Sequence, residues 1–135
     1  MGEVFKLNHC YNMDCLPAME LFPDNYFDLA VVNAGDFLCT AYCTEKREHI
    51  CGTGTGITAS GAPVEADVTV AADPDVFPFG TVLYIEDVGV RIVQDKGAGI
   101  QGKHLDIAVS GSHEDALSWQ GYGTHRVWII QEAAK

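Results

Sequence analysis

The chain has 135 residues, of which 47% are hydrophobic, and its formal net charge is −11. This length fits one domain with at most a short appendage, and the hydrophobic content is sufficient for a packed core. Only eight Lys and Arg residues stand against nineteen acids, which argues against a nucleic-acid partner, because phosphate binding depends on basic side chains.

The opening of the chain predicts neither a membrane span nor an export signal. The first residues, MGEVFKLNHCYNMD, lack the apolar core and the small-residue cleavage site of a signal peptide. No apolar run in the sequence reaches the length that a bilayer requires.

Residues 1–32 predict a short strand, a helical turn at LPAMELF, a turn at PDNY and a strand at FDLAVV. This stretch resembles the opening of DNA adenine or cytosine methyltransferases, in which such a strand leads into an Asp-Pro-Pro-Tyr catalytic motif. Here it leads into Asn33-Ala34-Gly35-Asp36, so the resemblance implies a fragment without methyl transfer. We expect residues 1–36 to be a structural appendage that packs on the domain or on a second subunit of a homodimer.

All five cysteines lie in the first 51 residues, at Cys10, Cys15, Cys39, Cys43 and Cys51. Free buried thiols are the first expectation, and a Cys43–Cys51 disulfide is the next for a protein that works outside the cell. Zinc is a weaker alternative because no CxxC pair is present, although His9 and His49 offer nitrogen ligands. We expect no metal and no cofactor.

From residue 37 onward, short apolar segments alternate with glycine-rich turns, as is typical of a small all-β barrel or sandwich. The expected strands are FLCTAYC, GITASG, DVTVAAD, TVLYIED, VGVRIVQD, LDIAVSG and HRVWII. Residues SHEDALSW predict a single helical turn, with Ser112 as N-cap and Asp115 three residues later. Residues 37–135 are therefore expected to form one mainly β domain.

Three aspartates of this domain are candidates for chemistry. Asp106 alternates with apolar neighbours, so its side chain should point away from the face that they bury. Desolvation in a cleft would raise its pKa, as a general acid requires. Asp73, before a proline, and Asp95, before a glycine-rich turn, also fit ordinary turn aspartates.

Several motifs in residues 37–130 together resemble the 3D domain, a family named for three aspartates and related to the catalytic barrel of MltA-type lytic transglycosylases. They are Thr40-Ala41-Tyr42-Cys43, residues 56–61, Ala72-Asp73-Pro74, residues 77–81, Asp95-Lys96-Gly97, Ile100-Gln101-Gly102 and His104-Leu105-Asp106. The resemblance implies a six-stranded double-psi β-barrel and action at the bacterial cell wall. It also implies cleavage of the bond between N-acetylmuramic acid and N-acetylglucosamine in peptidoglycan.

The resemblance assigns one acid to both proton transfers. Asp106 would protonate the glycosidic oxygen and then take the proton of the muramic C6 hydroxyl, which closes a 1,6-anhydro ring without water. Ordinary glycosidases use two carboxylates instead. Asp95 and Asp73 would support the reaction from the same groove, since nearby anions raise the pKa of a third carboxyl and favour an oxocarbenium-like transition state.

Six further residues are candidates for substrate binding: Thr40, Tyr42, Thr58, Lys96, Gly97 and His104. The resemblance places the hydroxyls along the sugar groove, although strand and turn chemistry also explains them. The family more often has a small residue at the position of Lys96. This lysine would bind a substrate carboxylate or acetamido oxygen, or it is a solvated residue of the turn. His104 would hold a proton or an N-acetyl group, or lie at a strand edge without such a role.

Two other functions remain open at this stage. Asp95-Lys96-Gly97 is similar to the Asp-Thr-Gly of an aspartic-protease half, but the lysine lacks the hydroxyl that such a site uses. A non-catalytic barrel of the expansin type would bind polysaccharide without cutting it. Analysis of products from digested cell-wall sacculi separates these possibilities.

Overall fold

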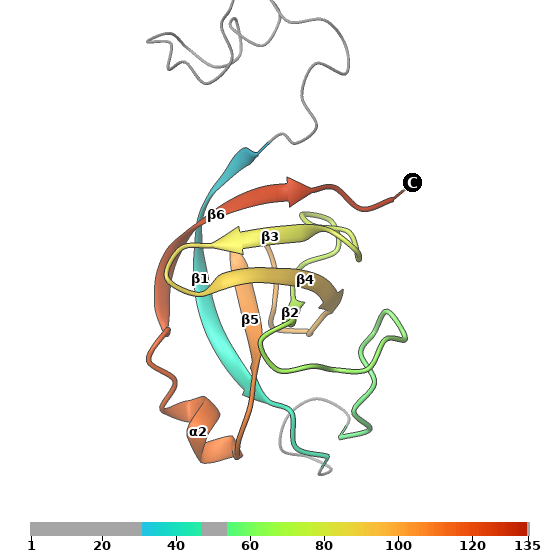
Figure 1. Cartoon of the computed structure of the whole chain (residues 1–135), viewed down its shortest axis with the longest axis vertical. Helices are drawn as coiled ribbons and strands as arrows, with labels where there is room; N and C mark the ends of the chain where they lie inside the picture. The colour runs from blue at the N-terminus through green and yellow to red at the C-terminus, as the bar shows by residue number, and fades with distance from the viewer. Residues whose placement is uncertain (1–30, 47–53, 135) are drawn as a thin grey trace, which may run out of the picture.

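The computed structural model describes residues 31–46 and 54–134 (Figure 1). Its strands close into a barrel in the order β1-β5-β2-β4-β3-β6. They are β1 (Val32–Cys43), β2 (Thr69–Ala71), β3 (Val82–Ile85), β4 (Gly89–Asp95), β5 (His104–Val109) and β6 (Gly123–Gln131), with helix α2 (His113–Leu117) before β6. The pairs β1/β5 and β2/β4 are parallel and the other neighbours are antiparallel. The expected mainly β, six-stranded barrel is confirmed, and its strand order is consistent with the double-psi form.

The core fills the interior of the barrel with apolar side chains of all six strands. Leu105 and Ile107 of β5 and Val93 of β4 are completely buried. Phe37 of β1 packs on Phe77, with ring centroids 5.2 Å apart. Burial of one such side chain stabilises the fold by roughly 1.5–3 kcal/mol. Because these strands are held by their buried faces, their other faces are free to carry polar groups.

The segment GITASG, expected as a strand, forms turns instead. Gly56 and Gly61 have φ angles of 75° and 89°, which lie outside the strand region. The amide and the hydroxyl of Thr58 both donate to the carbonyl oxygen of Ala62, each at 2.8 Å. Local hydrogen bonding and glycine conformation therefore outweigh the apolar pattern, and this segment forms a loop beside the end of β4.

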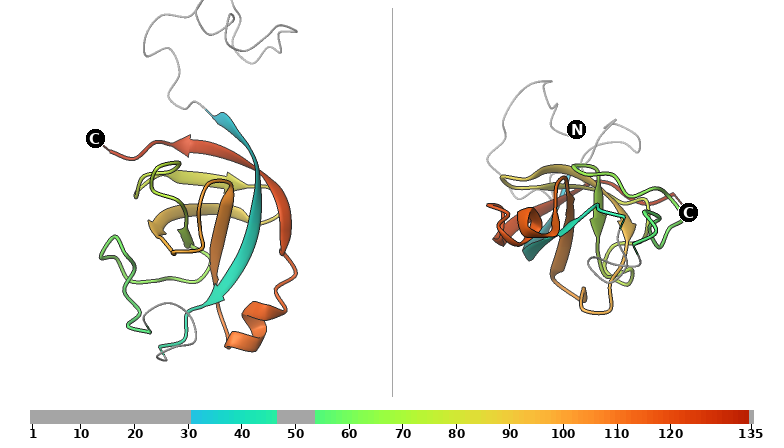
Figure 2. Two further views of the ribbon diagram at one scale, coloured as in Figure 1. Left: turned by 180° about the vertical axis from the view of Figure 1, so that it is seen from behind. Right: turned by 90° about the horizontal axis from the view of Figure 1, so that it is seen from below.

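Helix α2 is the single helical turn that the sequence predicts. The Ser112 hydroxyl accepts the amide of Asp115 at 3.2 Å, and the Asp115 carboxylate accepts the amide of Ser112 at 2.7 Å. This reciprocal capping box satisfies donors that a helix N-terminus leaves open. In Figure 1, α2 lies at the end of the barrel opposite the C-terminus, and Figure 2 shows β1 running along the wall beside β5.

The first barrel strand begins at Val32, so residues 32–36, expected in the appendage, pair with β6. Asp36 there forms an ion pair with Arg126 at 3.1 Å. The methyltransferase-like segment, the homodimer and the Cys43–Cys51 disulfide remain predictions, because residues 1–30 and 47–53 lie outside the described ranges.

Burial raises the pKa of the Cys39 thiol to about 11. Among the described residues, no helix is long and apolar enough to cross a membrane.

Candidate functional site

The pairing of four strands places the main candidate residues in one row across the barrel wall. Thr40 of β1 pairs with Asp106 of β5, Asp106 pairs with Ala71 of β2, and Ala71 also pairs with Asp95 of β4. Asp95 and Asp106 thus flank the same residue of the short strand between them. Two of the three candidate aspartates, Asp95 and Asp106, therefore lie on one part of the barrel wall, while Asp73 follows the end of β2.

A bulge turns Asp95 toward this row. Val70 pairs with Val93, but the next residue, Ala71, pairs with Asp95, so that Gln94 is skipped. A shift of one residue moves a strand's side chains to the opposite face. Without the bulge, Asp95 would share the core-facing side of Val93. The Gln94 side chain instead accepts the hydroxyl of Thr69 at 2.7 Å.

Asp106 is half-buried between the completely buried Leu105 and Ile107, as its alternating pattern predicts. Burial raises the pKa of its carboxyl, and the negative charge of Asp95 adds to the increase. A hydrogen bond from Thr40 and the charge of His104 lower that pKa again, but the net direction is upward. The result is a carboxyl that retains its proton to higher pH than an ordinary aspartate, which is the property of a general acid.

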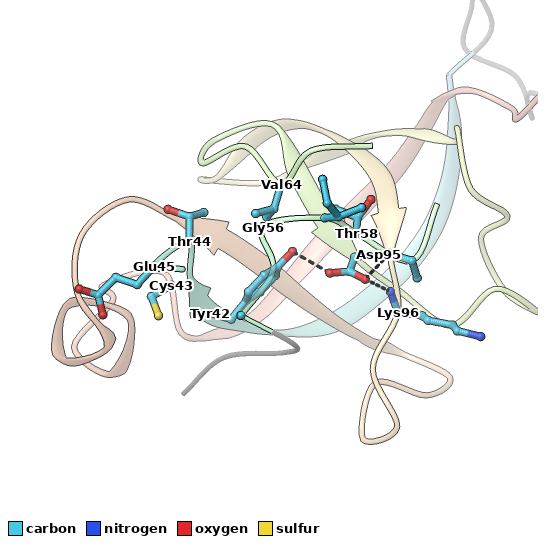
Figure 3. A pocket seen from close by; sticks show the side chains of 12 residues that line it. Tyr42, Cys43, Thr44, Glu45, Gly56, Thr58, Val64, Asp95 and Lys96 are labelled. Carbon is cyan, nitrogen blue, oxygen red and sulfur yellow. Dashed lines mark hydrogen bonds between the residues drawn. The ribbon is translucent and has the colours of Figure 1, made fainter. Parts of the chain in front are cut away.

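Asp95 is held in place by three donors from three segments (Figure 3). Its Oδ1 accepts the amide of Ala59 at 3.0 Å and the amide of Lys96 at 2.9 Å. Its Oδ2 accepts the hydroxyl of Tyr42 at 3.3 Å. Asp95 therefore joins β1, the turn of residues 58–62 and the end of β4.

Asp73 has a different local role. Its Oδ2 accepts the amide of Gly102 at 2.8 Å and its Oδ1 accepts the amide of Asp75 at 3.0 Å. These bonds, the one from Gly102 first, lower the pKa of this exposed carboxyl. Asp73 thus fastens the loop of residues 96–103 to the end of β2, two residues beyond Ala71.

A cavity of about 350 Å³ opens beside Asp95. Residues from the end of β1, the loop of residues 54–64 and the end of β4 line it, including Tyr42, Glu45, Thr58, Asp95 and Lys96. Its volume lies in the range of small-ligand sites. Asp95 belongs to this lining, whereas Asp106 lies outside it.

Three of the expected binding residues have their polar or backbone groups engaged within the chain. Thr58 is only 5% exposed and its hydroxyl is bonded within its own turn. A Cβ on Gly97 would lie 3.0 Å from Ile100, so loop packing explains this glycine. Lys96 anchors Asp95 through its amide, while its exposed side chain lies at the cavity.

Of the remaining three expected residues, Tyr42 bonds to Asp95, Thr40 contacts Asp106, and His104 contacts Thr40. The Thr40 hydroxyl donates to Oδ1 of Asp106 at 2.6 Å and lies 3.0 Å from Nε2 of His104. Nδ1 of His104 lies 3.2 Å from the carbonyl oxygen of Gly99. Of the two aromatic residues after α2, Trp119 packs against the core, whereas Tyr122 is exposed.

Sequence reasoning missed the groups of the site that belong to the backbone. The amides of Ala59 and Gly102 position Asp95 and Asp73, and the carbonyl of Gly99 faces His104. Any residue supplies such groups, so no residue type signals them. In the part of the chain that the structure describes, no three His, Cys, Asp or Glu side chains group to hold a metal ion.

The comparisons with known proteins agree with the expected family. Residues 68–131 match the family model of the 3D domain, so this segment carries the resemblance that its sequence indicates. The motifs at residues 40–43 and 56–61 precede the matched segment.

Two curated proteins of Bacillus subtilis (strain 168) are similar over 68 residues. One is "Cell wall-binding protein YocH", 34% identical over 48% of this chain and 23% of its own length. The other is "Putative cell wall shaping protein YabE", 35% identical over 50% of this chain and 16% of its own. The chain therefore corresponds to less than a quarter of either relative.

Solved structures of lytic transglycosylases also overlap part of the barrel. Escherichia coli MltA with bound chitohexaose has a TM-score of 0.49 and 23% identity, over 58% of this chain and 28% of that one. LtgG of Burkholderia pseudomallei has a TM-score of 0.45 and 22% identity, over 55% of this chain and 26% of that one.

Proposed function

We propose that this chain is a cell-wall lytic transglycosylase that cleaves the bond between N-acetylmuramic acid and N-acetylglucosamine in peptidoglycan. The observation that carries the proposal is the half-buried Asp106, whose raised pKa results first from burial and then from Asp95. A carboxyl with a raised pKa, on the same barrel wall as a second carboxyl held by hydrogen bonds, suits a reaction in which one acid carries out both proton transfers. The 3D-domain match and the names of the Bacillus relatives support the cell wall as its substrate and place of action.

The reaction begins with protonated Asp106. It donates its proton to the glycosidic oxygen, the bond from that oxygen to C1 of the muramic residue breaks, and positive charge develops at C1 and the ring oxygen. The Asp106 carboxylate then takes the proton of the C6 hydroxyl while that oxygen bonds to C1. The products are a 1,6-anhydro end and a free hydroxyl on the departing sugar, and Asp106 regains its proton.

Asp95 contributes its charge without exchanging a proton. Its three donors fix the carboxylate in place, and a fixed negative charge near the reacting sugar would stabilise the developing oxocarbenium ion. Asp73 contributes indirectly, because its hydrogen bond from Gly102 positions the loop that leads into β5. Lys96 and Tyr42 border the cavity, where we place a neighbouring sugar and its N-acetyl or carboxylate group.

A second candidate is a barrel that binds glycan without cutting it. The observation in its favour is that the 34%-identical relative is named a cell wall-binding protein. The cavity beside Asp95 would then be the binding site, and the raised pKa of Asp106 would have no catalytic use.

Digestion of purified sacculi separates the two candidates. The full chain is incubated with sacculi, and both the released and the sedimented material are analysed by mass spectrometry. A transglycosylase releases muropeptides with 1,6-anhydro ends. A binding barrel sediments with the sacculi and releases none, and reducing N-acetylmuramic ends would indicate a hydrolase, contrary to the proposal.

A further inference from the structure

A chain of side-chain contacts leads from Asp106 into the protein. The hydroxyl oxygen of Thr40 lies between Oδ1 of Asp106, at 2.6 Å, and Nε2 of His104, at 3.0 Å. The other ring nitrogen of His104 lies 3.2 Å from the carbonyl oxygen of Gly99. The contacts bridge β1 and β5 at two levels of their parallel pairing that are two residues apart, since Leu38 pairs with His104 and Thr40 with Asp106.

The number of available protons limits how the Asp106, Thr40 and His104 side chains can be hydrogen-bonded to one another. A carbonyl oxygen only accepts, so Nδ1 of His104 carries a hydrogen and donates to Gly99. Thr40 has one hydroxyl proton for two neighbours, and its third contact, the carbonyl oxygen of Leu105 at 3.5 Å, is too long to compete. The hydroxyl therefore donates to one neighbour and must accept from the other.

Two arrangements satisfy every group, and both contain the same extra proton. In the first, protonated Asp106 donates to Thr40, and Thr40 donates to Nε2 of neutral His104. In the second, the Asp106 carboxylate accepts from Thr40, and Thr40 accepts from Nε2–H of charged His104. When this proton is absent, the lone pair on Nε2 faces the lone pair of the Thr40 oxygen.

We propose that His104 is a positioning residue that shares one proton with Asp106 through the Thr40 hydroxyl. This inference rests on the proposed function, in which Asp106 must begin the reaction protonated. Conversion of the first arrangement into the second breaks the O–H bonds of Asp106 and Thr40 and forms a new O–H bond at Thr40 and an N–H bond at Nε2 of His104. One proton therefore moves in net from Asp106 to His104. The essential proton thus belongs to the pair, and a titration reports the pair.

His104 contacts groups of the protein itself, which does not fit a role in substrate binding. Both ring nitrogens have partners inside the chain, so contact with an N-acetyl group would require the loss of one of them. The charges that act on Asp106 from the neighbouring groups are those of His104 on β5 and Asp95 on β4, with opposite effects on its pKa. Thr40 is the uncharged bridge, and its hydroxyl is the group to test.

The test follows the His104 imidazole by nitrogen and carbon NMR across a pH titration. In the unaltered chain, neutral His104 should be the Nδ1–H tautomer; an Nε2–H tautomer overturns the proposal without any variant. Asp106→Asn should lower the proton-binding constant of His104 about tenfold, a change equivalent to about 1.4 kcal/mol. The same substitution in a Thr40→Val background should change it less than threefold, and in a Thr40→Ser background about tenfold again.

Two outcomes contradict the shared proton. If Asp106→Asn leaves the His104 titration unchanged, the two groups are independent and His104 only fastens the loop at Gly99. If Asp106→Asn changes the proton-binding constant of His104 as much in the Thr40→Val background as in the unaltered chain, the charge of Asp106 acts on His104 through space and the Thr40 hydroxyl is not a bridge. None of these measurements uses sacculi. The shared proton is therefore tested independently of the transglycosylase activity.

Discussion

The substitution Asp95→Asn isolates the charge of Asp95 from its structural contacts. Oδ1 of an asparagine still accepts the amides of Ala59 and Lys96, and its NH2 group replaces Oδ2 beside the Tyr42 hydroxyl, which then accepts. Because Asp95 and Asp106 flank one strand residue, about two strand spacings, or roughly 9.6 Å, separate them. At an effective dielectric constant of about 20, a unit charge at that distance contributes roughly 1.7 kcal/mol.

The expected result is a decrease of about twentyfold in the rate of anhydro-muropeptide release, because 1.36 kcal/mol corresponds to tenfold. The pKa of Asp106 should also fall, since Asp95 raises it, so the basic limb of the pH–rate profile should move to lower pH. Rates are measured by chromatography of soluble muropeptides at several pH values.

Asp95→Ala is the matched control. It removes all three hydrogen bonds, at about 1 kcal/mol each, and should lower the melting temperature, whereas Asp95→Asn should not. Unchanged activity in Asp95→Asn would refute the electrostatic reasoning, and equal losses of stability in the two variants would refute the structural part.

Three further predictions concern the elements that support the site. Asp73→Ala should cost stability at neutral pH, and the gap from the unaltered chain should close as pH falls below about 4. The amide of Gly102 lowers the pKa of Asp73 in the folded protein. The stabilisation by Asp73 is therefore present above the pKa of the unfolded state and is lost as the carboxyl is protonated. Melting curves between neutral and acidic pH test this dependence. Ser112→Ala removes the N-cap of α2 and should cost about 0.5–2 kcal/mol in denaturant titrations, while Ser112→Asp, which keeps a cap, should cost less. Leu105→Ala should cost about 2–5 kcal/mol, because Leu105 is completely buried beside Asp106; a loss under 1 kcal/mol would contradict the tight packing of β5.

Elements whose signal is local could be predicted from the sequence. The alternation around Asp106 predicts its face because Leu105 and Ile107 need the core, and the structure confirms it. The capping pair Ser112 and Asp115 is three residues apart and independent of the rest of the fold, and it is confirmed as well.

Features that depend on pairing between strands could not be predicted in the same way. The bulge that skips Gln94 decides the face of Asp95, and it exists only because β2 and β4 lie side by side. Residues 56–61 have strand-like composition, but their glycines and the Thr58 hydroxyl favour a turn whose amide at Ala59 reaches Asp95. The role of Asp73 in holding the loop at Gly102 likewise follows from the tertiary structure alone.

In the proposed mechanism, Asp106 is the only group that exchanges protons with the substrate, and the C6 hydroxyl, not water, is the nucleophile. This mechanism is tested most directly by digestion of sacculi in water labelled with a heavy oxygen isotope, with the unaltered chain and Asp106→Asn in parallel. The unaltered chain should release 1,6-anhydro products without the label. Asp106→Asn should keep its fold and its binding to sacculi but release no products. Products that carry the label at reducing ends, or undiminished release by Asp106→Asn, would contradict it.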